Sequence, residues 1–514
     1  MSFVTIIRDK MHRNNNNNLI YGLAALFFIP AVAITYFQKN EYVVVSVWLL
    51  YSILFFLVIT IFIFVRIIAY YKNKYKIKYE NKYIIREKLF LNISKTETEQ
   101  TVIYGGKRHH KYKKVTVLFA DIQGFTRIVE HMNPELLIDE LDKFFFHFDG
   151  VVEKYGIEKI KTIGDAYMCA GGLPQKNRTN PVEVVMAAIE MQQYMKKAKH
   201  TIVNTGDDMG FWELRIGVHT GPVISGVIGQ KKRSFDIWGD TVNIASRMES
   251  SGVAGEINIT GVTYQLTKEF FINEYRGKMP VKYKGETDMY FVKGIRPELS
   301  IDGKGEEPNE MFFIRLQHIR YNDIEEFVLK KLETEIPSNM YYHNVSHTKD
   351  VITRVDVLGR AENVSDEELL LLKTAALLHD VGFIISYENH EDNSIIFAKE
   401  LLPVYKYSKA QIREIVSLID ITRVDSKPST LLEKIMKDAD LDYLGRSDFV
   451  PVSESLFKEL KDNGVKLSIE EWNRMQFDFI SNHTFYTDSA KNLRQVNKDR
   501  QLQKLKELVA EYQF

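Results

Sequence analysis

Two aspartates in the first half of the chain have the type and setting needed to hold a hard divalent cation. Asp121 follows the apolar, β-rich run VTVLFA at 115–120, and we expect the strand to end at this carboxylate. Asp165 belongs to Gly164-Asp165, a two-residue connection typical of a hairpin, so it is expected at an exposed tip. Such a pair leaves coordination sites free for phosphate oxygens. Taken by spacing alone, capping or solvation of the two side chains is the commoner explanation.

An amide and a guanidinium share one face of a predicted helix further along the chain. The segment DIWGD at 236–240 leads into this helix, in which Asn243 and Arg247 are four residues apart. Side chains of these two types together suit an anion or a phosphoryl transition state. A hydrogen bond on the helix surface is the simpler explanation of the pair.

Histidines and aspartates in the last third of the chain could form a metal shell. His343 and His347 are four residues apart, which predicts that they share a helical face. His379-Asp380 follows a strongly apolar helical run, and Asp440 follows another helical stretch. Each feature is unremarkable alone, but the set supplies the imidazole and carboxylate ligands of a transition-metal site.

The elements that must position these groups are also indicated by the sequence. NPE at 133–135 predicts a helix start, and apolar residues at helical spacing continue the helix to Gly156. Two short strands are expected at 160–163 and 166–170. A turn-rich, charged linker at 300–310 precedes a helix-dominated unit.

The composition excludes several classes of protein. The chain has 514 residues, 68 Lys+Arg against 68 Asp+Glu, 45% hydrophobic residues and one Cys. The length suggests about three units, and a chain of this composition is not disordered. One cysteine excludes an intrachain disulfide scaffold and a cysteine-rich zinc domain, and Cys169 is expected to be a buried thiol. Zero formal net charge removes the electrostatic argument for nucleic acid as a partner.

Two apolar runs near the N-terminus predict transmembrane helices. Residues 19–37 and 42–65 are each long enough to cross about 30 Å of hydrocarbon. Basic residues flank the pair on both sides, so both ends are expected in the cytoplasm, with membrane lipid as a partner. A signal peptide for the first run and a buried core helix for the second are the alternatives. The helical stalk expected at 69–100 carries tyrosines along one side, either to dimerise or to lie on anionic lipid.

Four ordered blocks in the first soluble region resemble the class III nucleotidyl cyclase catalytic domain. They are FADIQGFT at 119–126, EKIKTIGDAYM at 158–168, RIGVHTGPVISGVIG at 215–229 and FDIWGDTVNIASRMES at 235–250. The resemblance implies an α/β domain of the ferredoxin-like α+β kind. It outweighs the simpler explanations given above for the separate residues.

This resemblance assigns metal-binding and base-binding roles to particular residues. Asp121 and Asp165, assisted by the backbone carbonyl of Ile122, would hold two Mg²⁺ or Mn²⁺ ions. Lys161 and Asp236 occupy the positions that contact the purine. A lysine can donate to ring N1 of adenine and a carboxylate can accept from its exocyclic amine, whereas guanine presents the opposite pattern. ATP is therefore the expected substrate, with a guanylyl cyclase as the alternative.

Further roles complete the implied site. Asn243 would orient the ribose, and Arg247 would stabilise charge on the α-phosphate. Lys282 would hold the terminal phosphates, with Lys284 as its alternative. The implied reaction is attack of the ribose 3′-oxygen on the α-phosphorus with loss of pyrophosphate. In this family each site lies between two such domains, so one domain per chain implies a homodimer with two equivalent sites.

The C-terminal region resembles the HD-domain metal-dependent phosphohydrolases. The resemblance implies a divalent metal, either Mn²⁺, Fe²⁺, Mg²⁺ or Zn²⁺, that makes a nucleophile from bound water. Its ligands would be His347, His379, Asp380 and Asp440, with Asp438 as the alternative to the last.

Part of this region also resembles the cyclic-nucleotide phosphodiesterases. The segment is YHNVSHTKDV at 342–351, in which the position of His343 protonates the leaving oxygen. Phe383 stands where those enzymes place another histidine, so a second metal and cyclic-nucleotide specificity are both open. His390 is either a partial substitute or a structural residue.

The predicted architecture is that of a multidomain integral membrane protein. It has an N-terminal segment with two transmembrane helices (1–68), a stalk (69–100), an α/β cyclase domain (101–300), a linker (301–312) and an all-α HD domain (313–514). The expected function is a membrane-anchored homodimeric adenylyl cyclase whose HD domain hydrolyses or senses a nucleotide. The alternatives are a nucleotide phosphohydrolase regulated by the cyclase domain and a guanylyl cyclase.

Overall fold

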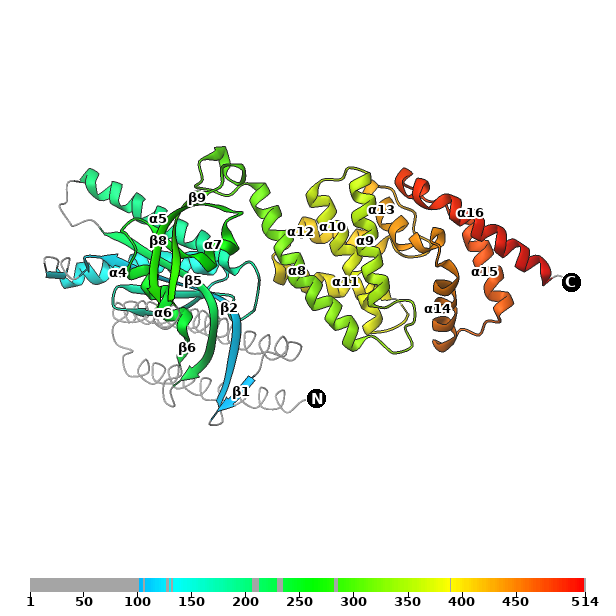
Figure 1. Cartoon of the computed structure of the whole chain (residues 1–514), viewed down its shortest axis with the longest axis horizontal. Coiled ribbons are helices and arrows are strands. Elements are labelled where there is room, and N and C mark those ends of the chain that lie inside the picture. The colour runs from blue at the N-terminus through cyan, green and yellow to red at the C-terminus, as the bar shows by residue number, and fades with distance from the viewer. Residues whose placement is uncertain are drawn as a thin grey trace, which may run out of the picture. The chain divides into compact units, whose positions relative to one another are not determined.

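The computed structural model describes residues 101–104, 107–125, 129–130, 133–205, 212–228, 234–281, 285–388 and 390–512. The segments expected to form two membrane helices and the stalk lie outside these residues. Within the described part of the chain, no helix combines the length and the apolar character needed to cross a bilayer. The described residues form a strand-rich region followed by a helical one (Figure 1).

The described strands of the first region form one nine-stranded sheet. Its order is β3-β4-β2-β5-β7-β9-β8, with β1 on β2 and β6 on β5. The bounds are Thr101–Tyr104 (β1), Lys107–Gln123 (β2), Glu158–Ile163 (β3), Ala166–Gly171 (β4), Glu213–Ile228 (β5), Ser234–Trp238 (β6), Ile257–Thr260 (β7), Phe271–Val281 (β8) and Gly285–Ile295 (β9). Paired strands are antiparallel except β5 and β7, which are parallel.

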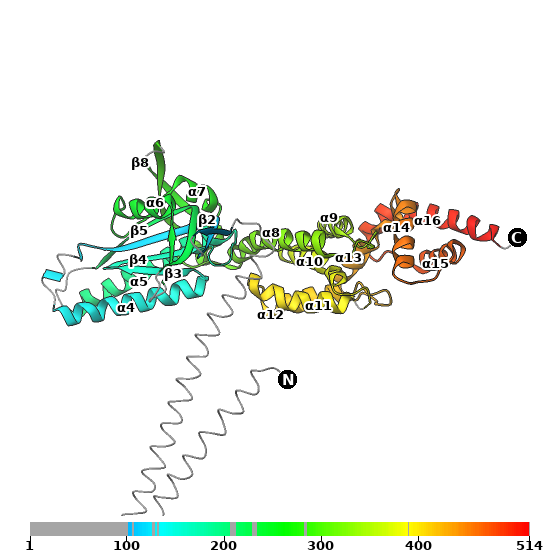
Figure 2. The ribbon, with the colours of Figure 1, turned by 90° about the horizontal axis from the view of Figure 1, so that it is seen from below.

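Helices cover both faces of this sheet. The long helices α4 (Pro134–Tyr155) and α5 (Asn180–Thr205) lie on one face, and α6 (Asp240–Ser250) lies on the other (Figure 2). Apolar side chains of α4 and α5 pack with alternate residues of β2 and β5 to form the core. The short helix α7 (Gly261–Thr267) follows β7. The expected α/β character of this domain is confirmed.

Local sequence signals set both ends of α4. The side chain of Asn133 accepts a hydrogen bond from the backbone N–H of Glu135 at 2.9 Å. Gly156 adopts a φ of 71°, the left-handed conformation that glycine favours after the last turn of a helix. The predicted helix is therefore confirmed at both ends. The hairpin predicted around Gly164-Asp165 is confirmed as well, because β3 and β4 pair on either side of it.

The strand that carries Asp121 is longer than the sequence predicted. We expected it to end at Asp121, which was wrong, because β2 continues to Gln123. The register with β5 places Asp121 opposite Arg215 and Gln123 opposite Glu213. These polar residues stay in the strand because a distant strand pairs with their backbone.

The second region is helical in its described residues. Its helices are α8 (Glu310–Glu335), α9 (Val345–Ala361), α10 (Asp366–Leu378), α11 (His390–Leu401), α12 (Lys409–Asp420), α13 (Leu431–Asp440), α14 (Phe449–Asp462), α15 (Ile469–Asn482) and α16 (Asp488–Glu511). Short 3₁₀ turns are η1 (Pro297–Leu299), η2 (Ile301–Gly303), η3 (Val381–Ile384), η4 (Leu402–Tyr405) and η5 (Asp442–Gly445). The expected all-α character of this region is confirmed.

Capping interactions fix where several of these helices begin. At the start of α10, α12, α13 and α15, an N-cap Ser or Thr and a Glu or Gln three residues later satisfy each other's backbone N–H groups. Apolar side chains from α8 to α16 fill a second core. His379 directly follows α10 and Asp440 ends α13, so these two candidate ligands are held at the ends of packed helices.

Candidate active sites

The two candidate metal aspartates of the first region lie close enough for the charge of Asp165 to raise the pKa of Asp121. Asp121 comes from β2, and Asp165 comes from the turn between β3 and β4. Burial, followed by repulsion from Asp165 and Glu249, raises the pKa of Asp121 to about 6. A divalent cation would relieve the repulsion between the two carboxylates, and it would bind them in their deprotonated form. The pair therefore fits the metal ions expected there.

A guanidinium group of the protein lies beside this pair. Arg215, opposite Asp121 in the sheet, has its Nη2 3.3 Å from Oδ2 of Asp121 and its Nε 2.6 Å from Oε1 of Glu249. Glu249 is buried near the end of α6. That helix lies so close to β5 that a Cβ on Gly217 would be 1.9 Å from the backbone nitrogen of Glu249. Sequence reasoning missed both charged residues, although Arg215 opens one of the four quoted blocks.

The two residues expected to contact the base also lie together. Nζ of Lys161 in β3 is 2.7 Å from Oδ2 of Asp236 in β6. The other carboxylate oxygen of Asp236 accepts the backbone N–H of Ile237 at 2.9 Å. The Lys161 side chain is 41% exposed, so a ligand can reach the pair from solvent. One donor beside one acceptor complements the hydrogen-bonding edge of adenine.

The residues expected to contact the ribose and the transition state lie apart from the aspartates. Asn243 and Arg247 are on the exposed side of α6, whose other side is buried in the domain. Among the contacts that the structure describes, none joins either residue to Asp121 or Asp165. The described part of the chain therefore brings together the metal aspartates and, separately, the base-contacting pair.

The remaining candidates are Ile122 and the two alternative lysines, Lys282 and Lys284. Ile122, whose carbonyl was expected to assist the metal, is a buried β2 residue opposite Leu214. Lys282 and its alternative Lys284, expected to hold the terminal phosphates, lie outside the described residues.

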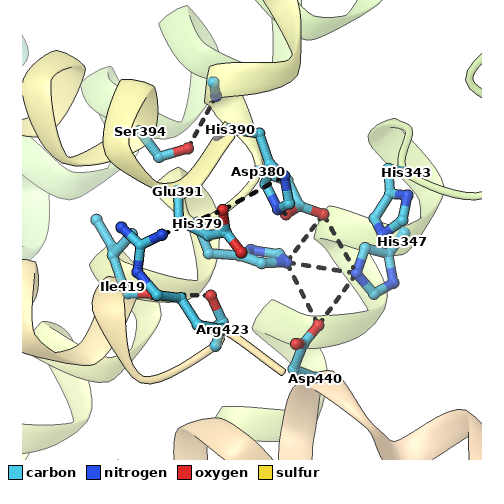
Figure 3. A network of polar contacts seen from close by, with 12 residues as sticks. His343, His347, His379, Asp380, His390, Glu391, Ser394, Ile419, Arg423 and Asp440 are labelled. Carbon is cyan, nitrogen blue, oxygen red and sulfur yellow. Dashed lines mark hydrogen bonds and ion pairs between the residues drawn. The ribbon is translucent and has the colours of Figure 1, made fainter. Parts of the chain in front are cut away.

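The candidate metal ligands of the helical region form one cluster (Figure 3). Nε2 of His347 in α9 and Nε2 of His379 after α10 are 3.3 Å apart. Oδ2 of Asp380 lies 3.4 Å and 3.1 Å from these two nitrogens. Oδ1 of Asp440 lies 3.3 Å and 3.5 Å from them. Ligand atoms bound at about 2.1 Å to a single ion are separated by about 3.0 to 3.4 Å, so these distances suit one metal.

Burial and hydrogen bonding also suit a cation here. His379 and Asp380 are 1% and 4% exposed, and the described contacts of Oδ2 of Asp380 are with the two imidazole nitrogens of the cluster. Nδ1 of His379 lies 2.8 Å from the carbonyl of Ala376, so it can donate there and leave Nε2 as a lone pair for a metal. A buried carboxylate needs a proton or a cation beside it, and a bound metal ion would supply the cation. Two imidazoles with two carboxylates are ligands that Mn²⁺, Fe²⁺ and Zn²⁺ accept.

Without metal, the cluster holds protons in place of the cation. Burial alone would lower the pKa of His379, but the Asp380 carboxylate beside it holds that pKa well above its ordinary value. In return, burial opposes ionisation of Asp380, yet the neighbouring imidazoles, His379 first, hold its pKa below the ordinary value.

His343 precedes α9 instead of lying on it. We expected His343 and His347 on one helical face, which was wrong, because α9 starts at Val345 after the N-cap Asn344. The Asn344 side chain accepts the backbone N–H of Ser346 at 2.8 Å and so fixes this start. The two histidine rings still lie close together, with centroids 5.7 Å apart.

Glu459 is a functional candidate that sequence reasoning missed. Its fully buried carboxylate accepts the backbone N–H groups of Tyr342 and His343 at 2.8 Å and 3.0 Å, and lies 2.5 Å from Nδ1 of His343. Burial lowers the pKa of His343, but the hydrogen bond to Glu459 and the charge of Asp380 outweigh burial and raise it. A protonated imidazole beside a metal cluster can act as a general acid. Only the tertiary placement of α14 could have identified this residue.

Neighbouring residues define the edges of the cluster. The rings of Phe383 and His390 stack with centroids 3.8 Å apart. Nε2 of His390 is 3.6 Å from Oδ1 of Asp380, so His390 adjoins the cluster on the side away from the four ligand atoms. Asp438, the alternative ligand, instead accepts the backbone N–H groups of Tyr486 and Thr487 at 2.9 Å and 2.7 Å.

A cavity of about 140 Å³ opens beside the cluster. Its lining includes His347 and Asp440 together with Tyr342, Tyr443 and Arg446. A ligand can therefore reach the metal cluster through a space that offers aromatic rings and a guanidinium group.

Two family models match the chain in the regions described above. Residues 108–294 match the adenylate and guanylate cyclase catalytic domain, and residues 344–442 match the HD domain. The chain thus carries a class III nucleotide cyclase catalytic domain followed by an HD domain.

Similar proteins include cyclases of both base specificities. A germination-specific adenylate cyclase of Dictyostelium discoideum is 40% identical over 228 residues, which are 43% of this chain and 25% of the relative. Guanylyl cyclase C of Homo sapiens is 36% identical over 193 residues, 36% of this chain and 17% of the relative. The solved adenylyl cyclase CyaB from P. aeruginosa is 32% identical, with 36% of this chain and 95% of its own chain covered and a TM-score of 0.34. The chain spans a quarter or less of the length of the two curated relatives.

Proposed function

We propose that the cyclase domain converts ATP to 3′,5′-cyclic AMP and pyrophosphate. The observation that carries this proposal is the pairing of Lys161 with Asp236, because this donor and acceptor complement adenine and mismatch guanine. The family model supports the class of reaction. Since the similar proteins include adenylyl and guanylyl cyclases, the choice of base rests on this pair.

The side chains beside the triphosphate have separate tasks. Asp121 and Asp165 would hold the divalent ions, and Arg215 adds a fixed positive charge beside these aspartates. Mg²⁺ or Mn²⁺ held there would supply Lewis-acid chemistry, lowering the pKa of the 3′-hydroxyl and neutralising phosphate charge. Lys161 and Asp236 fix the base, so the 3′-oxygen is aligned with the α-phosphorus as pyrophosphate leaves.

In each site, Asp121 and Asp165 come from one chain, whereas the base-contacting, ribose-contacting and transition-state residues come from a second chain. Asn243 orients the ribose, and Arg247 stabilises the charge that develops on the α-phosphate. Both are exposed on α6 and have no described contact with Asp121, which supports a site shared between two copies of the domain. The assembly is a head-to-tail homodimer with two equivalent sites. Lys282 completes the proposal as the ligand of the terminal phosphates.

Synthesis of cyclic AMP by purified full-length protein with Mn²⁺ and ATP tests the activity. Asp165→Ala should abolish product formation because it removes a metal ligand. Lys159→Ala is a matched control on the same hairpin, since Lys159 pairs with Asp149 on the surface and should be dispensable. Absence of any cyclic nucleotide from the unaltered protein with either ATP or GTP would refute the proposal.

Base selectivity is tested separately. The pair of changes Lys161→Glu and Asp236→Cys should weaken the use of ATP and admit GTP, because it replaces the adenine-type donor and acceptor with a guanine-type set. The ratio of kcat/KM for the two nucleotides is the measurement. An unchanged ratio would refute the assignment of the two base-contacting residues.

We propose a second activity for the HD domain, hydrolysis of a nucleotide phosphoester with a divalent metal. The His343–Glu459 pair carries it, because a proton donor beside the cluster serves a leaving oxygen and is not needed to bind metal. A divalent metal held by His347, His379, Asp380 and Asp440 would supply a nucleophile derived from water. The alternative is a sensor that binds a nucleotide without turning it over.

The full-length Asp165→Ala variant allows this activity to be measured without synthesis of cyclic AMP. It would be incubated with Mn²⁺ and, separately, with cyclic AMP, cyclic GMP, (p)ppGpp and dNTPs. Turnover of one of these that disappears in the Asp440→Asn double variant supports hydrolysis. Binding without turnover of any of them identifies a sensor and refutes the hydrolase.

We propose that the segments 19–37 and 42–65 anchor the protein in the cell membrane with both catalytic domains in the cytoplasm. Their apolar character and their basic flanks support this arrangement. The full chain should remain with membranes after an alkaline carbonate wash, whereas a chain lacking residues 1–68 should be released. Release of both would refute the anchor.

A further inference from the structure

One helix belongs to the cores of both domains. Phe312 and Leu316, near the start of α8, pack in the core of the cyclase domain. Tyr321 and Ile324, further along the same helix, pack in the core of the HD domain. Because α8 runs without interruption from Glu310 to Glu335, a shift of its second half is carried to its first half.

A buried carboxylate joins the two domains beside this helix. Glu183, in the first turn of α5, has a side chain that is 6% exposed. Its Oε1 accepts from Arg320 of α8 at 3.0 Å and from Lys406, just after η4, at 2.9 Å. Lys406 also donates to the backbone carbonyl of Tyr155 in α4 at 2.9 Å. A buried charge with two partners depends strongly on both of them, so this contact responds to a small displacement of either cation.

On the HD side, η4 and α11 connect Lys406 to the metal cluster. Lys406 follows η4, which follows α11, and the first residue of α11 is His390, 3.6 Å from the candidate ligand Asp380. The backbone N–H of Gly382, two residues after Asp380, donates to Oγ of Ser394 in α11 at 2.8 Å. Figure 3 shows Asp380, His390 and Ser394 near one another. These contacts, together with the chain from α11 through η4, connect Asp380 to Lys406.

On the cyclase side, hydrogen bonds connect α5 to the strand that carries Asp121. Asn180, the first residue of α5, accepts from the hydroxyl of Thr116 in β2 at 2.6 Å, and the same strand carries Asp121. Gln192, further along α5, donates to the carbonyl of Leu214 at 2.8 Å, next to Arg215 in β5. Helix α5 is thus bonded to both strands that present charged groups to the cyclase site.

We propose that Glu183 couples the two sites, so that the metal-bound state of the HD cluster sets the rate of the cyclase domain. The proposal rests on the cyclase activity proposed above. It assigns the HD domain a regulatory role that holds whether or not this domain also hydrolyses a nucleotide. The second contact between the domains, Arg178 with Asp323 and Glu326, lies nearer the surface and adds less, because solvent screens it.

A double-mutant cycle in the full chain tests the coupling. Asp440→Asn disrupts the HD cluster, and Lys406→Met removes one partner of Glu183 without touching either site. Cyclase kcat would be measured at saturating Mn²⁺ and ATP for the unaltered protein, each single variant and the double variant. In the otherwise unaltered protein, Asp440→Asn should change kcat by about threefold or more. In the Lys406→Met background, the fold-change in kcat caused by Asp440→Asn should be less than half as large.

A matched control separates coupling from local damage. Lys399 is exposed on α11, one turn before η4, and Lys399→Met should leave the effect of Asp440→Asn intact. His347→Gln is a second way to disrupt the cluster and should act in the same direction as Asp440→Asn. Thermal unfolding would confirm that each variant is folded.

The outcomes are distinguishable from those of the proposed function. An active unaltered protein whose kcat is unchanged by both cluster variants overturns the coupling and leaves the cyclase assignment in place. Equal effects of Asp440→Asn with and without Lys406→Met overturn the role of Glu183. Absence of cyclic nucleotide synthesis by the unaltered protein overturns the proposed function itself.

Discussion

The HD cluster and the cyclase site differ in how much of each a single chain supplies. At the HD cluster, four candidate ligand atoms from α9, the end of α10 and α13 lie a few ångströms apart within one chain. In the cyclase domain, Asp121 lies beside Asp165, but Arg247 is exposed on α6 without a described contact to either. A single chain therefore gathers the candidate ligands of the HD cluster, whereas it holds the candidate residues of the cyclase site in separate places, as the proposed shared site requires.

Burial accounts for this difference. His379 and Asp380 are almost fully buried, so the ligand set must be satisfied within the fold by protons or by a cation. The side chain of Asp121 remains 25% exposed and is paired with Arg215. Solvent and this guanidinium group therefore screen the charge of the aspartate within a single chain. A half-site can be stable on its own only when it is not deeply buried. The cyclase reaction should therefore depend on dimerisation, whereas metal binding by the HD cluster should not.

Mixing two inactive variants tests the comparison most severely. Asp165→Ala and Arg247→Ala should each lower cyclase activity by about 100-fold or more, because they remove a metal ligand and a transition-state charge. A one-to-one mixture allowed to exchange should regain about a quarter of the normal activity, since half of the dimers then contain one intact site of two. Cyclic AMP production after co-expression is the measurement.

The same experiment on the HD cluster should give the opposite result. His379→Ala and Asp440→Asn remove ligands of a site that lies in one chain, so their mixture should regain no HD function, measured as Mn²⁺ binding. Recovery in the HD mixture, or none in the cyclase mixture, would contradict the contrast between the two sites.

Metal should stabilise the HD domain more than the cyclase domain. A ligand present at 100 times its Kd adds about 2.7 kcal/mol to the free energy of unfolding. Mn²⁺ should therefore raise the unfolding temperature of the HD transition in the unaltered protein and in Asp165→Ala, and the increase should disappear in Asp440→Asn. Differential scanning calorimetry with and without Mn²⁺ measures this. An equal increase in Asp440→Asn would place the stabilising metal outside the HD cluster.

Local elements of this fold were predictable because their signals are close together in sequence. The start of α4 depends on Asn133 and its end on Gly156, both of which act on neighbouring backbone groups. The turn at Gly164-Asp165 and the end of α10 before His379 likewise follow from adjacent residues. The metal-type residues could be named by resemblance, since they stand inside recognisable blocks.

Features set by tertiary packing were not predictable. Strand β2 continues past Asp121 because β5 pairs with it, and β5 is about 90 residues away in sequence. Glu459 contacts His343 across 116 positions, so no local pattern marks it. Glu249 was quoted within a block, yet its contact with Arg215 depends on the close approach of α6 to the sheet.

Glu249 offers a finer test of the cyclase half-site. Because its carboxylate holds Nε of Arg215 beside Asp121, Glu249→Gln should loosen the guanidinium and raise the KM for ATP about tenfold with a smaller change in kcat. Lys293 pairs with Glu256 on the surface of the same domain, so Glu256→Gln is the matched control and should leave KM unchanged. Steady-state kinetics with both variants distinguish the two. A fall in kcat that is larger than the rise in KM would show that Glu249 acts on the transition state.

The smallest expected effect is a pH dependence of metal binding to the cyclase half-site. The pKa of Asp121, raised to about 6 mainly by burial, means that the metal-free domain binds a proton which Mn²⁺ must displace. Affinity for Mn²⁺ should therefore fall about twofold from pH 7 to 6 and about tenfold by pH 5. By the same linkage, the stability that this proton gives the metal-free domain is present below about pH 4 and is lost as the pH rises through 6. Titration of Mn²⁺ into the Asp440→Asn variant, followed by electron paramagnetic resonance without nucleotide, isolates this site from the HD cluster. A constant affinity between pH 7 and 5 would show that Asp121 does not bind a proton in the metal-free protein.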